Sequence, residues 1–171
     1  KLDIITSNWE GYHRIFVKQK NSFHDMSSLE FRSPSRIRTV ISADFDNDGY
    51  DEIFLNNIGQ PNKLFRILDA GKLEEIKLDE ALEANGLGTG AAVADIDNDG
   101  ILELLISHGE SGAQPLSLFK AKVANKNYIR IKPINSFGAP ARGATVTMHT
   151  NLRSHAKTID AGSGYLCQME P

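Results

Sequence analysis

The chain has 171 residues, of which 40% are hydrophobic and 24% charged, and its formal net charge is -3 at pH 7. This length allows one domain or part of a larger protein, and the hydrophobic content is ordinary for a globular fold. Lys and Arg are scattered, and no apolar run reaches the ~18 residues of a membrane span, so the sequence predicts neither nucleic-acid binding nor a membrane helix.

Residues 3–8 open the chain with an acid followed by a short apolar strand, DIITSN, and this pattern recurs at 52–57 and 103–108. A strand containing phenylalanine follows in each copy, at Phe16, Phe65 and Phe119. A period near 50 residues is typical of stacked or radial repeats. Asp3 therefore stands where Glu52 and Glu103 stand, and we expect the rest of its loop to precede Lys1.

Two acidic loops, 44–52 (DFDNDGYDE) and 95–103 (DIDNDGILE), lie 51 residues apart. Each has carboxylates at positions 1, 3, 5 and 9 and glycine at position 6. So many negative charges on a short loop repel one another unless a cation lies among them. Ca²⁺ accepts six to eight oxygen ligands, and a loop of alternating acids supplies them, with glycine allowing the sharp turn.

The predicted calcium ligands are the acids at positions 1, 3, 5 and 9 together with the backbone carbonyl at position 7. In the first loop they are Asp44, Asp46, Asp48, the Tyr50 carbonyl and Glu52. In the second loop they are Asp95, Asp97, Asp99, the Ile101 carbonyl and Glu103.

Other interpretations of the loops fit less well. Acidic hairpin turns need only one or two such residues. An EF-hand requires Glu at position 12, where this chain has Leu55 and Ile106. Mg²⁺ prefers to keep its water, and Zn²⁺ prefers Cys or His ligands, which the loops lack.

Short apolar strands separated by Gly, Asn or Asp surround both loops. Only residues 78–84 read as helical, and Asn85-Gly86 ends that segment within two turns. Four short strands per ~50 residues are typical of a β-propeller blade. We therefore predict an all-β fold in which residues 1–126 form a partial propeller of about two complete blades and part of another. Besides the strands after each loop, we expect strands at 40–43, 91–94, 23–26 and 73–76.

From residue 127 the pattern changes to that of a separate antiparallel β module, cut short at Pro171. Residues 128–132 and 144–149 alternate as half-buried strands do. Residues 157–161 are a possible third strand before the turn at 162–165.

Three other features receive plain structural interpretations. His108 aligns with Asn8 and Asn57 in the repeat, which indicates a polar strand end and not a catalytic base. Cys167 is the single cysteine, so it forms no disulfide within this chain, and pairing with an outside cysteine is left open. Residues 162–164 (GSG) lack the context of a phosphate loop and indicate a tight turn.

The sequence ADFDNDG at 43–49, followed by Glu52-Ile53, resembles the FG-GAP/VCBS repeat of integrin α-chain propellers. Residues 141–146 and 161–171 resemble the ASPIC/UnbV domain. This pairing of modules is characteristic of the cartilage acidic protein family, and residues 107–110, 113–117 and 163–167 are especially similar to it. The resemblance implies a secreted, calcium-binding, non-enzymatic glycoprotein of the extracellular matrix, with the ASPIC/UnbV module beginning at residue 127.

We therefore expect a calcium-stabilised extracellular scaffold of adhesion type that binds a protein or glycan. The chain begins at Lys1 and shows no signal-peptide pattern, so we expect any secretion signal to lie outside this segment. The rival hypothesis is a Ca²⁺-dependent carbohydrate-active lyase or hydrolase, because such enzymes also use calcium-loop propellers. A lyase needs a base in a groove with aromatic platforms, and an aromatic content of 8% gives this little support.

Overall fold

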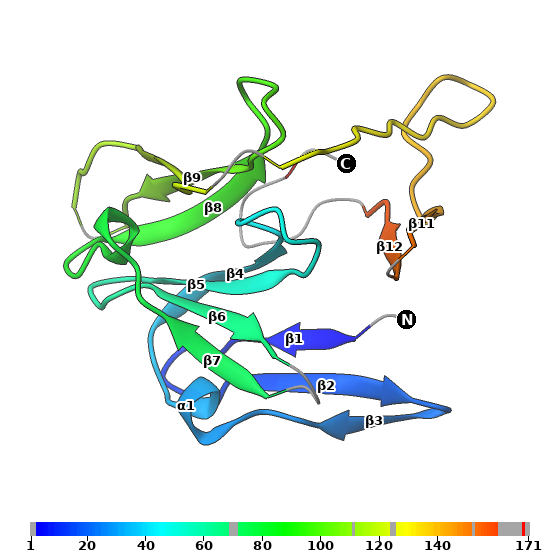
Figure 1. Cartoon of the computed structure of the whole chain (residues 1–171). Helices are drawn as coiled ribbons and strands as arrows, with labels where there is room; N and C mark the ends of the chain where they lie inside the picture. The colour runs from blue at the N-terminus through cyan, green and yellow to red at the C-terminus, as the bar shows by residue number, and fades with distance from the viewer. Residues whose placement is uncertain are drawn as a thin grey trace.

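A computed structural model describes residues 3–68, 72–110, 112–123, 126–151, 153–160 and 169. Among these residues the secondary structure is almost entirely β, which confirms the predicted fold class (Figure 1). The helical elements are α1 (Leu29–Arg32) and the 3₁₀ turn η2 (Glu80–Leu82). The strands are β1 (Ile4–Thr6), β2 (Arg14–Gln19), β3 (Ser22–Asp25), β4 (Ile37–Ala43), β5 (Glu52–Asn57), β6 (Lys63–Ile67), β7 (Leu73–Ile76), β8 (Gly88–Ala94), β9 (Glu103–His108), β10 (Ser117–Lys120), β11 (Thr145–His149) and β12 (Ser154–Thr158).

Antiparallel pairing of consecutive strands builds three sheets and one separate hairpin. The strand orders are β1-β2-β3, β4-β5-β6-β7, β10-β9-β8 and β11-β12. Each sheet is a meander of neighbours, which is how a propeller blade is connected. Within the described residues, one four-stranded unit therefore accompanies two three-stranded units, as expected for part of a propeller.

The two complete acidic loops join strands in the same register. Ala43 pairs with Glu52 across the first loop, and Ala94 pairs with Glu103 across the second. Both hairpins also carry an irregularity near the start of the first strand, between Ile37 and Thr39 and between Gly88 and Gly90. The sequence offset of 51 residues is therefore a structural repeat, and not only a repeated motif.

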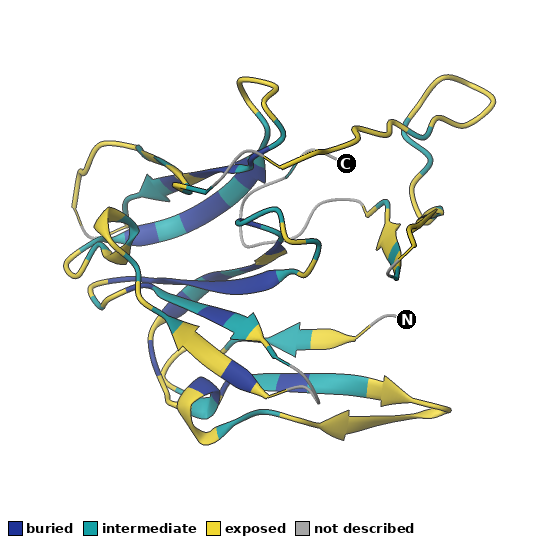
Figure 2. Cartoon of the chain, viewed as in Figure 1, coloured by how far each residue is buried: buried dark blue, intermediate teal, exposed yellow. Residues whose placement is uncertain are grey.

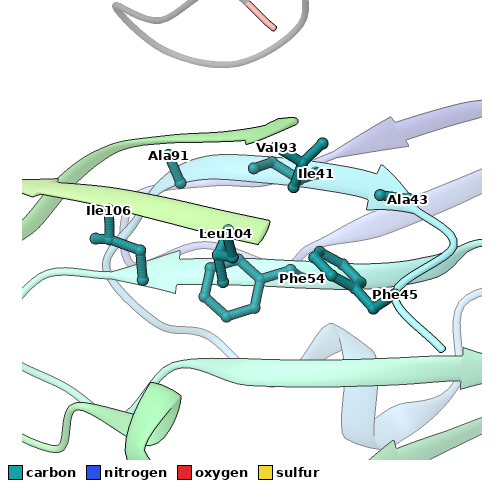
Figure 3. Packing of buried hydrophobic residues seen from close by; sticks show 8 residues of the cluster. All are labelled: Ile41, Ala43, Phe45, Phe54, Ala91, Val93, Leu104 and Ile106. Carbon is teal, nitrogen blue, oxygen red and sulfur yellow. The ribbon is translucent and has the colours of Figure 1, made fainter. Parts of the chain in front are cut away.

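A hydrophobic core holds the second and third sheets together (Figure 3). Apolar side chains from β4 and β5 pack against those from β8 and β9, and Phe45 joins them from the first acidic loop. The loop is thus anchored to the core at its second residue. The buried members are Ile41, Ala43, Phe45, Phe54, Ala91, Val93, Leu104 and Ile106.

A second core lies on the other face of β5. Phe31 of α1 meets Phe65 of β6 edge to face, with ring centroids 5.2 Å apart. Successive residues of a strand face opposite sides, so Ile53 and Leu55 enter this core while Phe54 enters the first. Because both faces of β5 are covered, its sequence is a continuous buried run. The buried members are Ile15, Phe31, Ile37, Ile53, Leu55, Phe65 and Leu73.

Three details differ from the sequence prediction. The helix expected at 78–84 is only the single turn η2, which Glu83 ends in a left-handed conformation with φ of 39°. Helix α1 was not anticipated, although Ser28 caps it by accepting a hydrogen bond from the Phe31 N–H.

Among the described residues, no helix is long and apolar enough to cross a lipid bilayer.

The third difference concerns the C-terminal part. Residues 128–132 form no strand, and the hairpin there consists of β11 and β12 alone. Most of the described residues between 126 and 160 are exposed (Figure 2). The second hairpin strand begins at Ser154, earlier than the expected 157. Cys167 and the 162–164 turn lie outside the described residues.

Candidate metal centres

The first acid of each loop organises the backbone of the turn. Asp44 accepts hydrogen bonds from the N–H groups of Asp48 at 2.9 Å and Gly49 at 2.8 Å. In the second loop Asp95 accepts from Asp99 at 3.0 Å and Gly100 at 3.2 Å. Two independent loops therefore close in the same way, with position 1 holding positions 5 and 6.

The acid at position 5 makes the next contact. An Asp48 carboxylate oxygen accepts from the N–H of Tyr50 at 2.8 Å, and Asp99 accepts from Ile101 at 3.0 Å. Tyr50 and Ile101 thus lie within the loops as expected, and the binding role of their carbonyl oxygens stays a prediction. The Tyr50 side chain is exposed and that of Ile101 is buried.

Positive φ angles appear at positions 4 and 6 of each loop. Gly49 and Gly100 have φ of 86° and 85°, and Asn47 and Asn98 have φ of 54° and 60°. Glycine was expected at position 6. The matching asparagine at position 4 went unnoticed, although Asn is among the few residues that adopt the left-handed region readily.

The glutamate at position 9 ties the end of each loop to its beginning. Glu52 accepts from the Phe45 N–H at 3.0 Å, and Glu103 accepts from the Ile96 N–H at 2.7 Å. Both side chains are buried at the start of a strand. Burial raises the pKa of the Glu52 carboxyl to about 7, while the Phe45 N–H opposes this rise. Burial also raises the pKa of Asp44.

The three aspartates of each loop converge. One carboxylate oxygen from each of Asp44, Asp46 and Asp48 lies within 4.8 Å of the others. The same holds for Asp95, Asp97 and Asp99. Residues separated by one position in the sequence therefore share one small space, as an ion site requires.

In the second and third sheets, a basic residue from the third strand reaches the acidic loop of the same sheet. Arg66 of β6 bonds to Asp46 and lies 3.5 Å from Glu52. The nitrogen of Lys120 in β10 lies 2.6 Å from Asp97, 2.8 Å from Asp99 and 2.7 Å from Glu103.

These contacts favour the charged forms of Asp99 and Lys120. The Lys120 hydrogen bond holds the pKa of Asp99 below its usual value. Desolvation opposes the charge of Lys120, but hydrogen bonds to Asp97 and Asp99 outweigh it and raise the pKa of the ammonium group. Sequence reasoning missed both basic residues, although each follows the repeat phenylalanine directly.

The geometry around Lys120 tests whether the residues fit a metal ion. Three carboxylate oxygens from Asp97, Asp99 and Glu103 already surround one cationic atom. The donors are all hard oxygens, which Ca²⁺ prefers and which do not favour Zn²⁺. The residues present therefore fit a hard divalent cation.

The polar residue at the end of β5 and β9, or just beyond β1, has a structural task in all three repeats. Asn8 donates to the carbonyl of Tyr12 at 2.5 Å, and Asn57 donates to that of Pro61 at 2.7 Å. His108 contacts the carbonyl of Pro115 at 2.7 Å through Nδ1. Each side chain thus holds the loop that follows its strand.

A Glu83–His108–Ser117 cluster lacks the order of a nucleophile and its base. Ser117 donates to Glu83 at 2.5 Å, and His108 Nε2 lies 3.1 Å from the other oxygen of Glu83. The carboxylate therefore lies between the hydroxyl and the imidazole, which ties η2 to the third sheet.

Comparison with known proteins agrees with the repeat geometry. The family of FG-GAP-like repeats matches residues 1–55 and 44–106. Cartilage acidic protein 1 of Homo sapiens is 48% identical over 185 aligned residues, which cover 100% of this chain and 28% of the human protein. The proteins of that name from Xenopus tropicalis and Mus musculus are 47% and 46% identical over 100% of this chain and 29% of their own length. The chain thus spans less than a third of the length of these curated relatives.

Proposed function

Because this chain belongs to the FG-GAP-like repeat family and is homologous along its whole length to a part of cartilage acidic protein 1, we propose that it is a calcium-stabilised segment of an extracellular binding scaffold. Residues 1–126 supply the propeller blades, and residues 127–171 supply the N-terminal part of an ASPIC/UnbV module. The partner is an extracellular protein or glycan, and the protein is secreted.

One observation carries the calcium assignment. Two loops 51 residues apart in the sequence share the hydrogen bonds accepted by the acids at positions 1, 5 and 9, the same left-handed positions and the same convergence of three aspartates. An acidic turn needs no such agreement, because one capping carboxylate is enough to hold a turn. The proposed ligands are the ten groups predicted from the sequence, five in each loop.

Bound Ca²⁺ would neutralise the clustered carboxylates and hold each hairpin closed. Extracellular calcium modules have dissociation constants of roughly 10⁻⁴–10⁻³ M. At a free Ca²⁺ concentration about tenfold above that constant, each site adds about 1.4 kcal/mol to the free energy of unfolding. Two sites therefore supply a useful part of the stability of a small β protein.

Isothermal titration calorimetry and thermal unfolding of the 171-residue chain test this proposal. We expect Ca²⁺ to bind at two sites and to raise the melting temperature. Asp46→Asn and Asp97→Asn should each remove one site, with little further effect on the metal-free protein. Asp79→Asn is the matched control, because Asp79 is exposed and makes no capping hydrogen bond. A chain that binds no Ca²⁺, or that loses no site in either variant, would refute the assignment.

A scaffold is preferred to an enzyme because of how His108 and Ser117 are used. His108 and Ser117 both bond to Glu83, and His108 is further occupied by a backbone carbonyl. Incubation with a panel of matrix glycans distinguishes the two functions. Binding without cleavage supports the scaffold, whereas Ca²⁺-dependent release of shorter glycans supports the carbohydrate-active alternative.

A further inference from the structure

The two acidic loops are contacted by the C-terminal segment, defined as residues 126–151 and 153–160. This segment carries six Lys or Arg and one acidic residue, Asp160. It is therefore strongly basic and lies against the most acidic part of the chain.

At the first loop, Arg153, which precedes β12, and His155 of β12 contact backbone carbonyls. Arg153 donates to the carbonyl of Asp48, and His155 Nδ1 lies 3.1 Å from the carbonyl of Gly49. Arg153 Nε also donates to His155 Nε2 at 2.8 Å. Because Nε2 accepts this bond, a neutral His155 carries its proton on Nδ1 and donates it to Gly49.

Three further contacts join the segment to the first loop. The guanidinium carbon of Arg153 lies 3.5 Å from the centre of the Tyr50 ring. Lys126 donates to the carbonyl of Asp46 at 2.9 Å, and Lys157 pairs with Asp51. Asp51 occupies position 8, which is not a predicted ligand.

At the second loop, Tyr128 and Arg130 of the same segment make the contacts. Tyr128 donates its hydroxyl to the carbonyl of Asn98 at 2.7 Å, and Arg130 donates to the Asn98 side chain. The left-handed asparagine at position 4, Asn98, thus accepts both of these hydrogen bonds from the segment.

In both loops an aromatic ring of the segment lies against the glycine at position 6. A Cβ built on Gly49 would lie 2.3 Å from a ring carbon of His155, and one on Gly100 would lie 2.1 Å from a ring carbon of Tyr128. One aromatic ring from a segment that does not itself repeat therefore sits on the same glycine of each repeat. Any side chain larger than hydrogen would exclude these rings.

We propose that the C-terminal segment is a clamp on the cation-bound conformation of both loops, so that Ca²⁺ binding and docking of the segment strengthen each other. This inference rests on the proposed calcium function. The described contacts go to backbone carbonyls, Asn98, the Tyr50 ring and Asp51, so the segment and the ion engage different groups of the same loops. An ion that fixes the loops fixes those carbonyls, and linkage makes the effect reciprocal.

Long-range charge works against this coupling, because bound Ca²⁺ lowers the attraction between acidic loops and basic segment. At physiological ionic strength that attraction is screened beyond about 8 Å. Contacts of about 3 Å to ordered carbonyls depend far more on loop geometry. Positive coupling is therefore the expected sign.

A crossed experiment on the full chain tests the clamp. Asp97→Asn leaves only the first calcium site, and Asp46→Asn leaves only the second. In the first background Arg153→Leu should weaken Ca²⁺ binding about fivefold or more, while Tyr128→Leu should have little effect. In the second background the two effects should exchange. Arg142→Leu removes an exposed charge from the same segment and is the control in both backgrounds.

Hydrogen exchange supplies a second readout that does not depend on affinity. Added Ca²⁺ should slow exchange in residues 126–160 of the unmodified chain, but less so when Arg153→Leu and Tyr128→Leu are combined. Normal Ca²⁺ binding with unchanged affinity in every clamp variant would overturn the clamp and leave the calcium function standing. Failure of the unmodified chain to bind Ca²⁺ would overturn both.

Discussion

Arg66 and Lys120 occupy the same place in successive repeats, and each directs its positive charge into the acidic loop of its own sheet. In the first repeat the equivalent residue is Val17, and there the neighbouring Lys18 N–H donates to Asp3 at 2.8 Å. Two of the three described sheets therefore provide an internal cation for their own loop. An ion entering either loop has to compete with that cation for carboxylate oxygens.

This competition predicts that Lys120→Met strengthens Ca²⁺ binding at the second loop several-fold. The variant frees Asp97, Asp99 and Glu103 from the ammonium group. It should also destabilise the calcium-free protein, since the three carboxylates then repel one another. Calorimetry in the Asp46→Asn background measures the remaining site alone. Lys122→Met, which removes an exposed lysine from the same stretch, is the control, and a weaker site in Lys120→Met would contradict the competition.

The contact between Phe31 and Phe65 predicts a large effect on stability. Phe31 is 1% exposed and links α1 to the second core. Phe31→Ala should lower the free energy of unfolding by about 3–5 kcal/mol, because it removes a buried ring and leaves a cavity. Phe137→Ala should change it by less than about 0.5 kcal/mol, because that side chain is 93% exposed. Urea denaturation followed by Trp9 fluorescence measures both, and equal losses would contradict the assignment of the core.

The pH dependence of stability follows from His13. Its Nδ1 accepts from the Asn8 N–H at 3.2 Å and its Nε2 lies 3.1 Å from the Ser35 hydroxyl, an arrangement that fits the neutral ring. Burial, and then the charge of Lys63, hold the pKa of His13 below 6.5. At pH values between the folded pKa and 6.5, His13 is therefore protonated in the unfolded chain but neutral in the folded chain. The stabilising contribution is present above pH 6.5 and is lost as the pH falls through the folded pKa.

The measurement compares the free energy of unfolding at several pH values for the wild type and His13→Gln. The slope contributed by His13 cannot exceed about 1.4 kcal/mol per pH unit. It should be absent from His13→Gln and retained in His24→Gln, which removes an exposed imidazole from β3, the neighbour of the strand that follows His13. An unchanged slope in His13→Gln would show that another group is responsible.

The acidic loops were predictable because their information is local. Four carboxylates and one glycine at fixed spacing in nine residues indicate the turn and the convergence of the three aspartates, and the second copy fixes the register. Arg66 and Lys120 were not found, because they lie one strand beyond the loop in the sheet. Nothing in the sequence between Glu103 and Lys120 shows that strand pairing returns the lysine to the loop.

The C-terminal segment shows a different limit of sequence reasoning. The alternation at 128–132 predicted a strand, yet the structure forms none there. Tyr128 and Arg130, two positions apart, both contact Asn98 instead. The alternation at 128–132 indicates only that one side of an extended chain contacts a polar surface. It does not report whether that surface is another strand, because sheet pairing depends on partners far away in sequence.

The glycine at position 6 of the first loop gives a final prediction, in which Gly59 is the matched control. Both residues have positive φ, 86° and 66°, so alanine strains either backbone by about 1–2 kcal/mol. Only at Gly49 would the added Cβ also collide with His155, because nothing lies within 4 Å at Gly59. Gly49→Ala should therefore cost more stability and expose residues 153–160 to limited proteolysis, and His155→Ala should recover part of the difference. Equal costs at the two glycines would show that φ alone selects glycine at position 6.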